Sequence, residues 1–152
     1  MNTARWGAAS IVINSKLWVM GGYKGTGGYG ITRSTDTTEF IDMRNVGQIT
    51  YGPRLTEGRA FHCVVKLNED ETMIIGADFP TSLRRKTEIY NTINGNWRDG
   101  PTLNNDRRHS ACALFQSSLH NNRKVVLVAG GGTDTAEILD YSQLNAQWVL
   151  SK

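Results

Sequence analysis

Short apolar runs alternate with polar turns along this chain, and the same order of runs occurs three times. The clearest run ends in small residues and appears at 17–22 (LWVMGG), 73–77 (MIIGA) and 125–131 (VVLVAGG). A Glu opens a later apolar run in each copy, and its spacing is 49 residues both times. This fixed period predicts three copies of one structural unit. An Arg stands upstream of each run, so each copy contains one Arg and one Glu: Arg5 and Glu39, Arg59 and Glu88, and Arg107 and Glu137.

Each unit is predicted to contain four short strands. The apolar runs are short, rich in β-branched residues and bounded by polar turns, and no apolar pattern keeps a helical period over three turns. Adjacent glycines end the second run well because they accept positive φ. The predicted strands are 8–13, 17–20, 38–42 and 48–51 in the first unit, 61–67, 72–76, 87–91 and the segment at Trp97 in the second, and 110–115, 125–130, 136–141 and the segment at Trp148 in the third.

The order of features within a unit resembles the kelch repeat, whose family builds β-propellers with one four-stranded blade per repeat. The likeness rests on an Arg, two apolar strands of which the second ends in Gly-Gly, a loop, a strand opened by Glu, and a Trp before a Pro-containing linker. It implies an all-β fold of three four-stranded antiparallel blades at residues 1–54, 55–103 and 104–152. Together they would form half of a propeller ring.

Large aromatic residues are expected to wedge between neighbouring blades, namely Tyr90, Trp97 and Trp148. The sequence departs from the kelch pattern in two places. Ile49 stands where the other units have Trp97 and Trp148, and the dipeptide at 76–77 is Gly-Ala in place of Gly-Gly. A rival propeller family with Gly-His and Trp-Asp signatures is not supported, because neither dipeptide occurs.

Three blades do not close a ring, since propellers typically have four to eight. The uncovered apolar faces of the first and third blades would drive association. Two interpretations follow. Either two copies form a homodimer that completes a six-bladed ring, which we favour, or the chain is part of a longer propeller.

The repeated Arg and Glu are predicted to be structural. They could form an ion pair or cap buried backbone groups. A catalytic residue is needed only once, so its repetition in every unit favours a structural role.

Composition and charge limit the classes of partner that the sequence predicts. The chain has 152 residues, of which 39% are hydrophobic and 20% charged, a balance typical of a globular protein. No apolar run is long enough to span a membrane, and the first residues lack the apolar stretch of a secretory signal. The formal charge of +3 is mild, and the only basic cluster is Arg84, Arg85 and Lys86. We therefore expect neither membrane nor nucleic-acid binding.

Two cysteines suggest a compartment. Cys63 and Cys112 each lie inside an apolar segment (HCVV and ACAL). We expect buried free thiols rather than a disulfide, and hence a reducing, cytoplasmic location.

The kelch resemblance implies that the loops between second and third strands gather on one face with the linkers between blades. Aromatic and cationic side chains on these loops suit an acidic protein or peptide, because Arg binds carboxylates through two hydrogen bonds. The alternative is a solvated rim without a partner. The predicted partner-binding residues are Tyr23, Lys24, Tyr29, Arg33, Arg54, Phe79, Arg84 and Arg85.

Signals for catalysis or cofactor binding are weak. Residues 25–30 (GTGGYG) match the dinucleotide fingerprint, but no helix-forming segment follows to receive a phosphate. The three histidines, His62, His109 and His120, lack the short spacing of metal ligands. We expect no cofactor and no metal.

The predicted function is non-catalytic binding of a protein or peptide through the loop-bearing face. The alternative is a propeller enzyme of the oxidase or sugar isomerase type with a site in the central funnel. That alternative needs convergent acid and base groups, for which the nearby acids are Asp78, Asp106 and Asp134.

Overall fold

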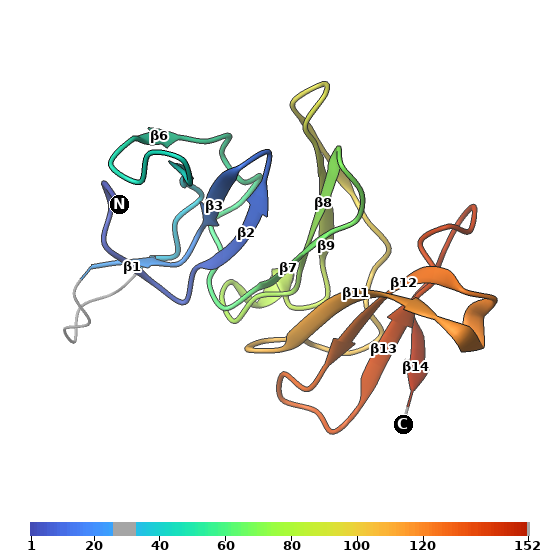
Figure 1. Cartoon of the computed structure of the whole chain (residues 1–152). Coiled ribbons are helices and arrows are strands. Elements are labelled where there is room, and N and C mark those ends of the chain that lie inside the picture. The colour runs from blue at the N-terminus through green and yellow to red at the C-terminus, as the bar shows by residue number, and fades with distance from the viewer. Residues whose placement is uncertain (26–32, 152) are drawn as a thin grey trace.

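The computed structural model of the chain describes residues 1–25 and 33–151. They form an all-β molecule in which three four-stranded antiparallel sheets follow one another along the chain (Figure 1). Sheet 1 contains β2 (Ala9–Ile13), β3 (Lys16–Met20), β5 (Thr38–Asp42) and β6 (Ile49–Tyr51). Sheet 2 contains β7 (Cys63–Lys66), β8 (Glu71–Ile75), β9 (Thr87–Asn91) and β10 (Asn96–Asp99). Sheet 3 contains β11 (Ala111–Ser117), β12 (Arg123–Ala129), β13 (Ala136–Leu139) and β14 (Val149–Ser151).

Within each sheet every strand pairs with the next strand of that sheet in chain order. Such antiparallel pairing matches the alternation of short apolar runs and polar tips in the sequence. The all-β prediction is confirmed, and all twelve expected strands are present.

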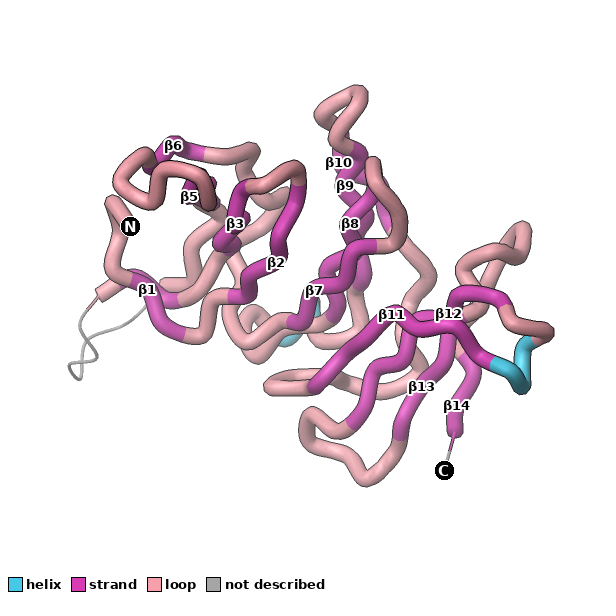
Figure 2. The backbone as a smooth tube through the Cα atoms, in the orientation of Figure 1, coloured by secondary structure: helices cyan, strands magenta, loops and turns pink. Residues whose placement is uncertain are grey.

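Shorter elements complete the described part of the chain. A two-residue strand, β1 (Arg5–Trp6), pairs with β4 (Tyr23–Lys24) outside the three sheets. Among the described residues only two short 3-10 turns are helical, η1 (Thr81–Leu83) and η2 (Ser118–His120) (Figure 2). Neither of these turns is long enough to cross a membrane.

Aromatic side chains fill the seam between sheets 1 and 2. Trp18 of β3 is fully buried, with its ring centroid 5.1 Å from that of Tyr90 and 6.2 Å from that of Trp97, both in sheet 2. The Trp97 indole N–H donates to the carbonyl oxygen of Arg54 at 2.8 Å. Burial of one such ring stabilises the fold by about 2 to 3 kcal/mol, so this cluster holds the two sheets together.

The seam between sheets 2 and 3 is an apolar core. Trp148 packs into it with 4% of its surface exposed, and its indole N–H donates to the carbonyl oxygen of Pro101 at 3.0 Å. Both indoles that the sequence nominated as wedges thus lie at seams and hold a linker carbonyl. The fully buried side chains of this core are Met73, Ile75, Ile89 and Leu103 on one side and Val126, Val128 and Leu139 on the other.

The Arg and Glu of each unit form an ion pair with little or no exposed side-chain surface. Arg5 Nη2 lies 2.7 Å from Glu39 Oε1, and neither side chain has exposed surface. Burial alone would raise the pKa of Glu39, but hydrogen bonds from Arg5 and from the backbone N–H groups of Asn2 and Thr3 lower it. Glu39 is therefore held as a carboxylate. The same pairing joins Arg59 to Glu88 and Arg107 to Glu137.

The guanidinium groups also cap backbone carbonyls. Arg5 Nη1 donates to the carbonyl oxygens of Gly21 at 2.7 Å and Thr37 at 2.8 Å. Arg107 Nη1 donates in the same way to Gly130 and Thr135, both at 2.7 Å. The two roles that the sequence left open, ion pairing and backbone capping, occur together in these two units.

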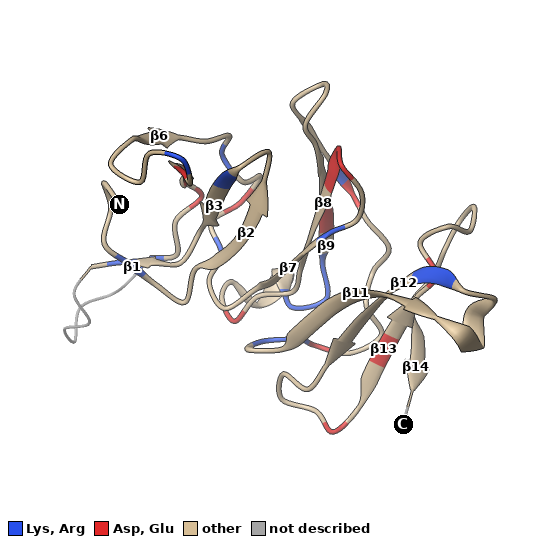
Figure 3. Cartoon of the chain, in the orientation of Figure 1, with Lys and Arg blue, Asp and Glu red and all other residues tan. Residues whose placement is uncertain are grey.

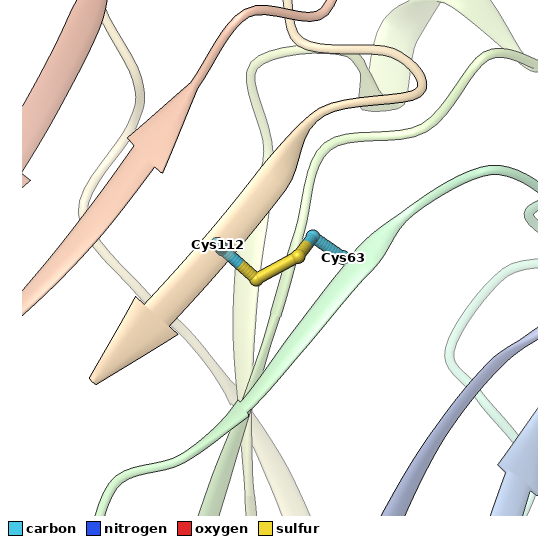
Figure 4. Close-up of a disulfide and its surroundings, with 2 residues drawn as sticks. All are labelled: Cys63 and Cys112. Carbon is cyan, nitrogen blue, oxygen red and sulfur yellow. A yellow bond between two sulfur atoms is a disulfide. The ribbon is translucent and has the colours of Figure 1, made fainter.

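A disulfide joins sheets 2 and 3, so the prediction of free thiols is wrong. Cys63 of β7 and Cys112 of β11 are bonded across the seam, with 6.1 Å between their Cα atoms (Figure 4). The expectation of a reducing, cytoplasmic location rested in part on free thiols and loses that support.

Candidate recognition surface

The loops that follow the second strand of each sheet all begin in one way. The N–H of Gly21 donates to the carbonyl oxygen of Thr37, that of Gly76 to Lys86, and that of Gly130 to Thr135. Each loop therefore leaves and returns at the same end of its sheet, above the buried Arg. Lys and Arg, drawn blue in Figure 3, occur in the segments that lead into β9 and β11 at this end.

A row of stacked rings runs along this end of the molecule. The Trp6 ring centroid lies 4.8 Å from that of Tyr23 and 5.5 Å from that of Phe61. The Phe61 ring stacks on His109 with centroids 3.8 Å apart. Trp6 precedes β2 and Tyr23 follows β3 of sheet 1, whereas Phe61 precedes sheet 2 and His109 precedes sheet 3. We call these four residues the ring row.

The ring row has both covered and open members. Tyr23 is buried, and its pKa is raised by that burial and by the nearby charge of Asp78. Trp6 is 42% exposed, and half of the His109 side chain is exposed. The buried tyrosine supports the row from below, and the exposed rings offer apolar area to a ligand.

Asp78 is the centre of the charges beside the row. Its carboxylate oxygens lie 3.5 Å from His109 Nε2, 3.6 Å from Arg108 Nη1 and 4.0 Å from Arg84 Nη2. Arg84 Nη1 is in addition 3.7 Å from Asp106. Arg108 keeps half of its side chain in solvent, so its charge is available to a partner.

The structure distributes the predicted partner-binding residues over three places. Tyr23, Phe79 and Arg84 lie at or beside the ring row, and Phe79 is 52% exposed. Lys24 and Arg54 line a separate hollow near β6, where Arg54 pairs with Asp36 at 2.8 Å.

Arg85 lines another hollow beside β10 and donates from Nε to the carbonyl oxygen of Leu103 at 2.8 Å. Arg33 is exposed. Tyr29 lies outside the described residues, as does most of the glycine-rich stretch at 25–30. Of the eight predicted residues, Tyr23 therefore belongs to the ring row, and Phe79 and Arg84 lie beside it.

Sequence reasoning missed Trp6, Phe61, Arg108 and His109 as surface residues. No signal for them existed in the sequence, because the feature that Phe61 and His109 share is a backbone angle. The residue two positions after the repeated Arg has positive φ in all three units: 65° at Gly7, 54° at Phe61 and 54° at His109. A non-glycine residue in that conformation is uncommon. Aromatic rings at these positions stack between neighbouring sheets.

The acids nominated for an enzyme do not form a separate pair. Asp78 and Asp106 both lie beside Arg84, and Asp134 is exposed. In residues 1–25 and 33–151 no three His, Cys, Asp or Glu side chains come together as metal ligands do. His62 is buried beside Arg59, and this burial lowers its pKa to about 3, which leaves it neutral.

Comparison of the sequence with protein-family models and with curated proteins found no match.

Proposed function

We propose that the three sheets are blades of a kelch-type β-propeller and that the chain is a non-catalytic module that binds a protein or peptide segment. Three observations support the blades. Each sheet is a four-stranded antiparallel meander, neighbouring sheets pack with indole side chains at the seams, and an Arg–Glu pair recurs beneath each loop.

The ring row carries the functional proposal. Rigid aromatic side chains supply large contact area at low entropic cost, and they are enriched at binding hot spots together with Arg. Here Trp6, Phe61 and His109 form such a strip, with Arg84 and Arg108 beside it. Loops on a stable scaffold are the usual place for such contacts.

The charges favour an acidic partner. Arg108, Arg85 and Lys24 are exposed cations on the loop-bearing end, and the whole chain has a formal charge of +3. An Arg guanidinium binds a carboxylate through two hydrogen bonds, while an aromatic neighbour fits the apolar part of the same peptide. A segment that mixes Asp or Glu with an apolar residue matches both features.

The experiment is a binding screen with a displayed peptide library, followed by affinity measurement on the selected peptides. We expect acidic peptides with an apolar residue to be selected. Arg108→Glu and Trp6→Ala should each weaken their binding more than tenfold. Arg44→Glu is the matched control, because Arg44 is an exposed Arg in the β5–β6 turn and should leave the affinity unchanged. Selection of peptides without acidic residues, or equal affinity for Arg108→Glu, would contradict the proposal.

A further inference from the structure

Equivalent backbone hydrogen bonds join the sheets at both seams, the one between sheets 1 and 2 and the one between sheets 2 and 3. The N–H of Gly22 donates to the carbonyl oxygen of Arg59 at 2.8 Å, and the N–H of Ala77 donates to that of Arg107 at 3.1 Å. Each bond runs from the residue after the strand-ending glycine to the Arg of the next unit.

A second bond runs in the other direction at each seam. The N–H of Phe61 donates to the carbonyl oxygen of Gly7 at 2.7 Å, and the N–H of His109 donates to that of Phe61 at 3.1 Å. Every seam therefore uses one donor and one acceptor from each of its two sheets.

The space beside each strand-ending glycine shows whether the Arg carbonyl of a neighbouring sheet occupies it. A Cβ built on Gly21 would overlap the carbonyl oxygen of Arg59, and one on Gly76 would overlap that of Arg107. Gly130 has the same backbone conformation, with φ of 69° against 61° and 64°, yet a Cβ there would meet nothing within 4 Å. Sheet 3 thus has the shape that receives an Arg carbonyl, with the space open.

The outer sides of sheets 1 and 3, which no other sheet of the described residues covers and which we call the free edges, carry complementary backbone groups. On sheet 3, the N–H of Gly131 and the carbonyl oxygen of His109 have no hydrogen-bond partner among the described residues. On sheet 1, the N–H of Gly7 likewise donates to no described residue. Gly131 corresponds to the donors Gly22 and Ala77, and Gly7 corresponds to the donors Phe61 and His109. Each edge is one half of the seam found twice inside the chain.

An apolar row on sheet 3 is uncovered, although its counterparts are buried. Register places Ala113, Leu127, Ile138 and Val149 in a row across the four strands. The matching row of sheet 2, Val65, Met73 and Ile89, is at most 4% exposed because sheet 3 covers it. Val149 is 65% exposed, and together with Ile138 it lines a hollow on the free face.

Sheet 1 presents a matching apolar row on its own free face. Val12, Leu17, Ile41 and Ile49 stand next to one another in the register of the four strands. Val12 is 51% exposed, and the other three are half-buried. In sheet 3 the corresponding face, with Val126 and Leu139, packs into the core against sheet 2.

We propose that a second copy of this chain covers both edges, so that sheet 3 of each copy packs on sheet 1 of the other with the same seam that joins the sheets within a chain. The two free edges lie at opposite ends of one molecule, so they cannot meet within it (Figure 1). Two identical seams between two copies give a closed ring of six sheets, within the four to eight of known propellers. This inference rests on the proposed propeller arrangement.

The occupant follows from complementarity. A seam needs an Arg carbonyl and an N–H from a residue with positive φ on one side, and a strand-ending glycine on the other. A second copy supplies both sides at once: Arg5 and Gly7 from one edge, and Gly130 from the other. The contact between two copies therefore uses the same backbone groups that join neighbouring sheets within one chain.

The test is the mass of the purified chain in solution, measured by light scattering and by sedimentation at about 1 to 50 µM. We expect twice the chain mass of 16.9 kDa. Val149→Asp should place a charge in the seam, and Gly130→Asn should fill the open space while tolerating positive φ. Each should raise the dimer dissociation constant at least tenfold.

Ile93→Asp is the matched control, because Ile93 is an apolar residue, 77% exposed, in the β9–β10 turn away from both edges. It should leave the dimer mass unchanged, and circular dichroism should show that all three variants keep their strands. A monomer at 50 µM overturns the proposal, as does an open-ended series of larger assemblies. A dimer that resists both Val149→Asp and Gly130→Asn overturns the assigned edges.

Failure of this proposal is distinguishable from failure of the proposed function. Arg108→Glu should weaken binding of acidic peptides more than tenfold without changing the mass, whereas Val149→Asp should change the mass without altering the ring row.

Discussion

Arg107 and Glu137 form a doubly hydrogen-bonded ion pair with no exposed side-chain surface. Glu137 Oε1 accepts from Arg107 Nε at 3.1 Å and from Nη2 at 3.0 Å. The other carboxylate oxygen accepts from the N–H of Asn104 at 2.7 Å. The pair therefore fixes the linker before sheet 3 to β13, and it does so where water cannot replace a lost partner.

Replacing Arg107 with Met should destabilise the fold by about 3 to 5 kcal/mol, because the Glu137 carboxylate is then buried without its counter-charge. Urea denaturation followed by circular dichroism measures the change. Arg107→Met with Glu137→Leu should recover part of the loss, since no buried charge remains. Arg44→Met is the control, because its ion pair with Asp42 is exposed, and it should leave the midpoint nearly unchanged. A loss below about 1 kcal/mol for Arg107→Met would mean that the pair is not structural.

The disulfide should be present in protein purified without reductant. Alkylation with iodoacetamide in denaturant should then label neither Cys63 nor Cys112, and mass spectrometry should find two labels only after reduction. The bond closes a segment of 49 residues, so reduction should lower the free energy of unfolding by about 2 to 4 kcal/mol. The double variant Cys63→Ala with Cys112→Ala should be insensitive to reductant. Labelling of both thiols without reduction would refute the bond.

The positions of the two cysteines within their repeat units contain a signal for this bond. Cys63 is four residues after Arg59, whereas Cys112 is five residues after Arg107. Because side chains alternate between the two faces of a strand, this offset of one places the cysteines on opposite faces of equivalent strands. Neighbouring sheets pack face to face, so the two sulfur atoms meet in the seam.

Strands were predictable because each buries alternate or continuous apolar residues. The segments that sequence reasoning missed or shortened have no such pattern. β11 and β12 extend through Gln116, Ser117, Arg123 and Lys124, whose backbones pair in a hairpin that continues beyond the apolar run. β1 and β4 are two residues each, too short for any period.

The candidate site was less predictable than the fold for a physical reason. Loop residues were chosen as exposed aromatic or cationic side chains, but exposure depends on packing between units distant in sequence. Tyr23 is covered by Trp6 and Phe61, and Arg84 is held between Asp78 and Asp106. Only the three-dimensional arrangement shows that Phe61 and His109, 48 residues apart, stack in one row.

His62 should make stability fall in mild acid. Its pKa is about 3 in the fold against an ordinary value of 6.5, because burial and the nearby Arg59 charge disfavour the protonated ring. The unfolded chain therefore binds a proton between pH 6.5 and 3 that the folded chain excludes, so stability present above pH 6.5 is lost as the pH falls. The slope is at most about 1.4 kcal/mol per pH unit. Urea titrations from pH 7 to 4 should show it in the native sequence, and His62→Asn should remove that component. Equal slopes for both proteins would contradict the buried neutral state.

Gly76 should tolerate no side chain, for a reason beyond its backbone conformation. Its φ is +64°, and a Cβ would overlap the carbonyl oxygen of Arg107, which the neighbouring Ala77 N–H binds at 3.1 Å. Gly95 is the matched comparison, because its φ is +71° but a Cβ there meets only the Tyr90 hydroxyl at 3.9 Å. Gly95→Ala should cost about 1 to 2 kcal/mol for the left-handed conformation alone. Gly76→Ala should cost more by thermal or urea denaturation, since it must also push sheet 3 away from sheet 2. Equal losses for the two variants would show that the contact between Gly76 and Arg107 does not hold the seam.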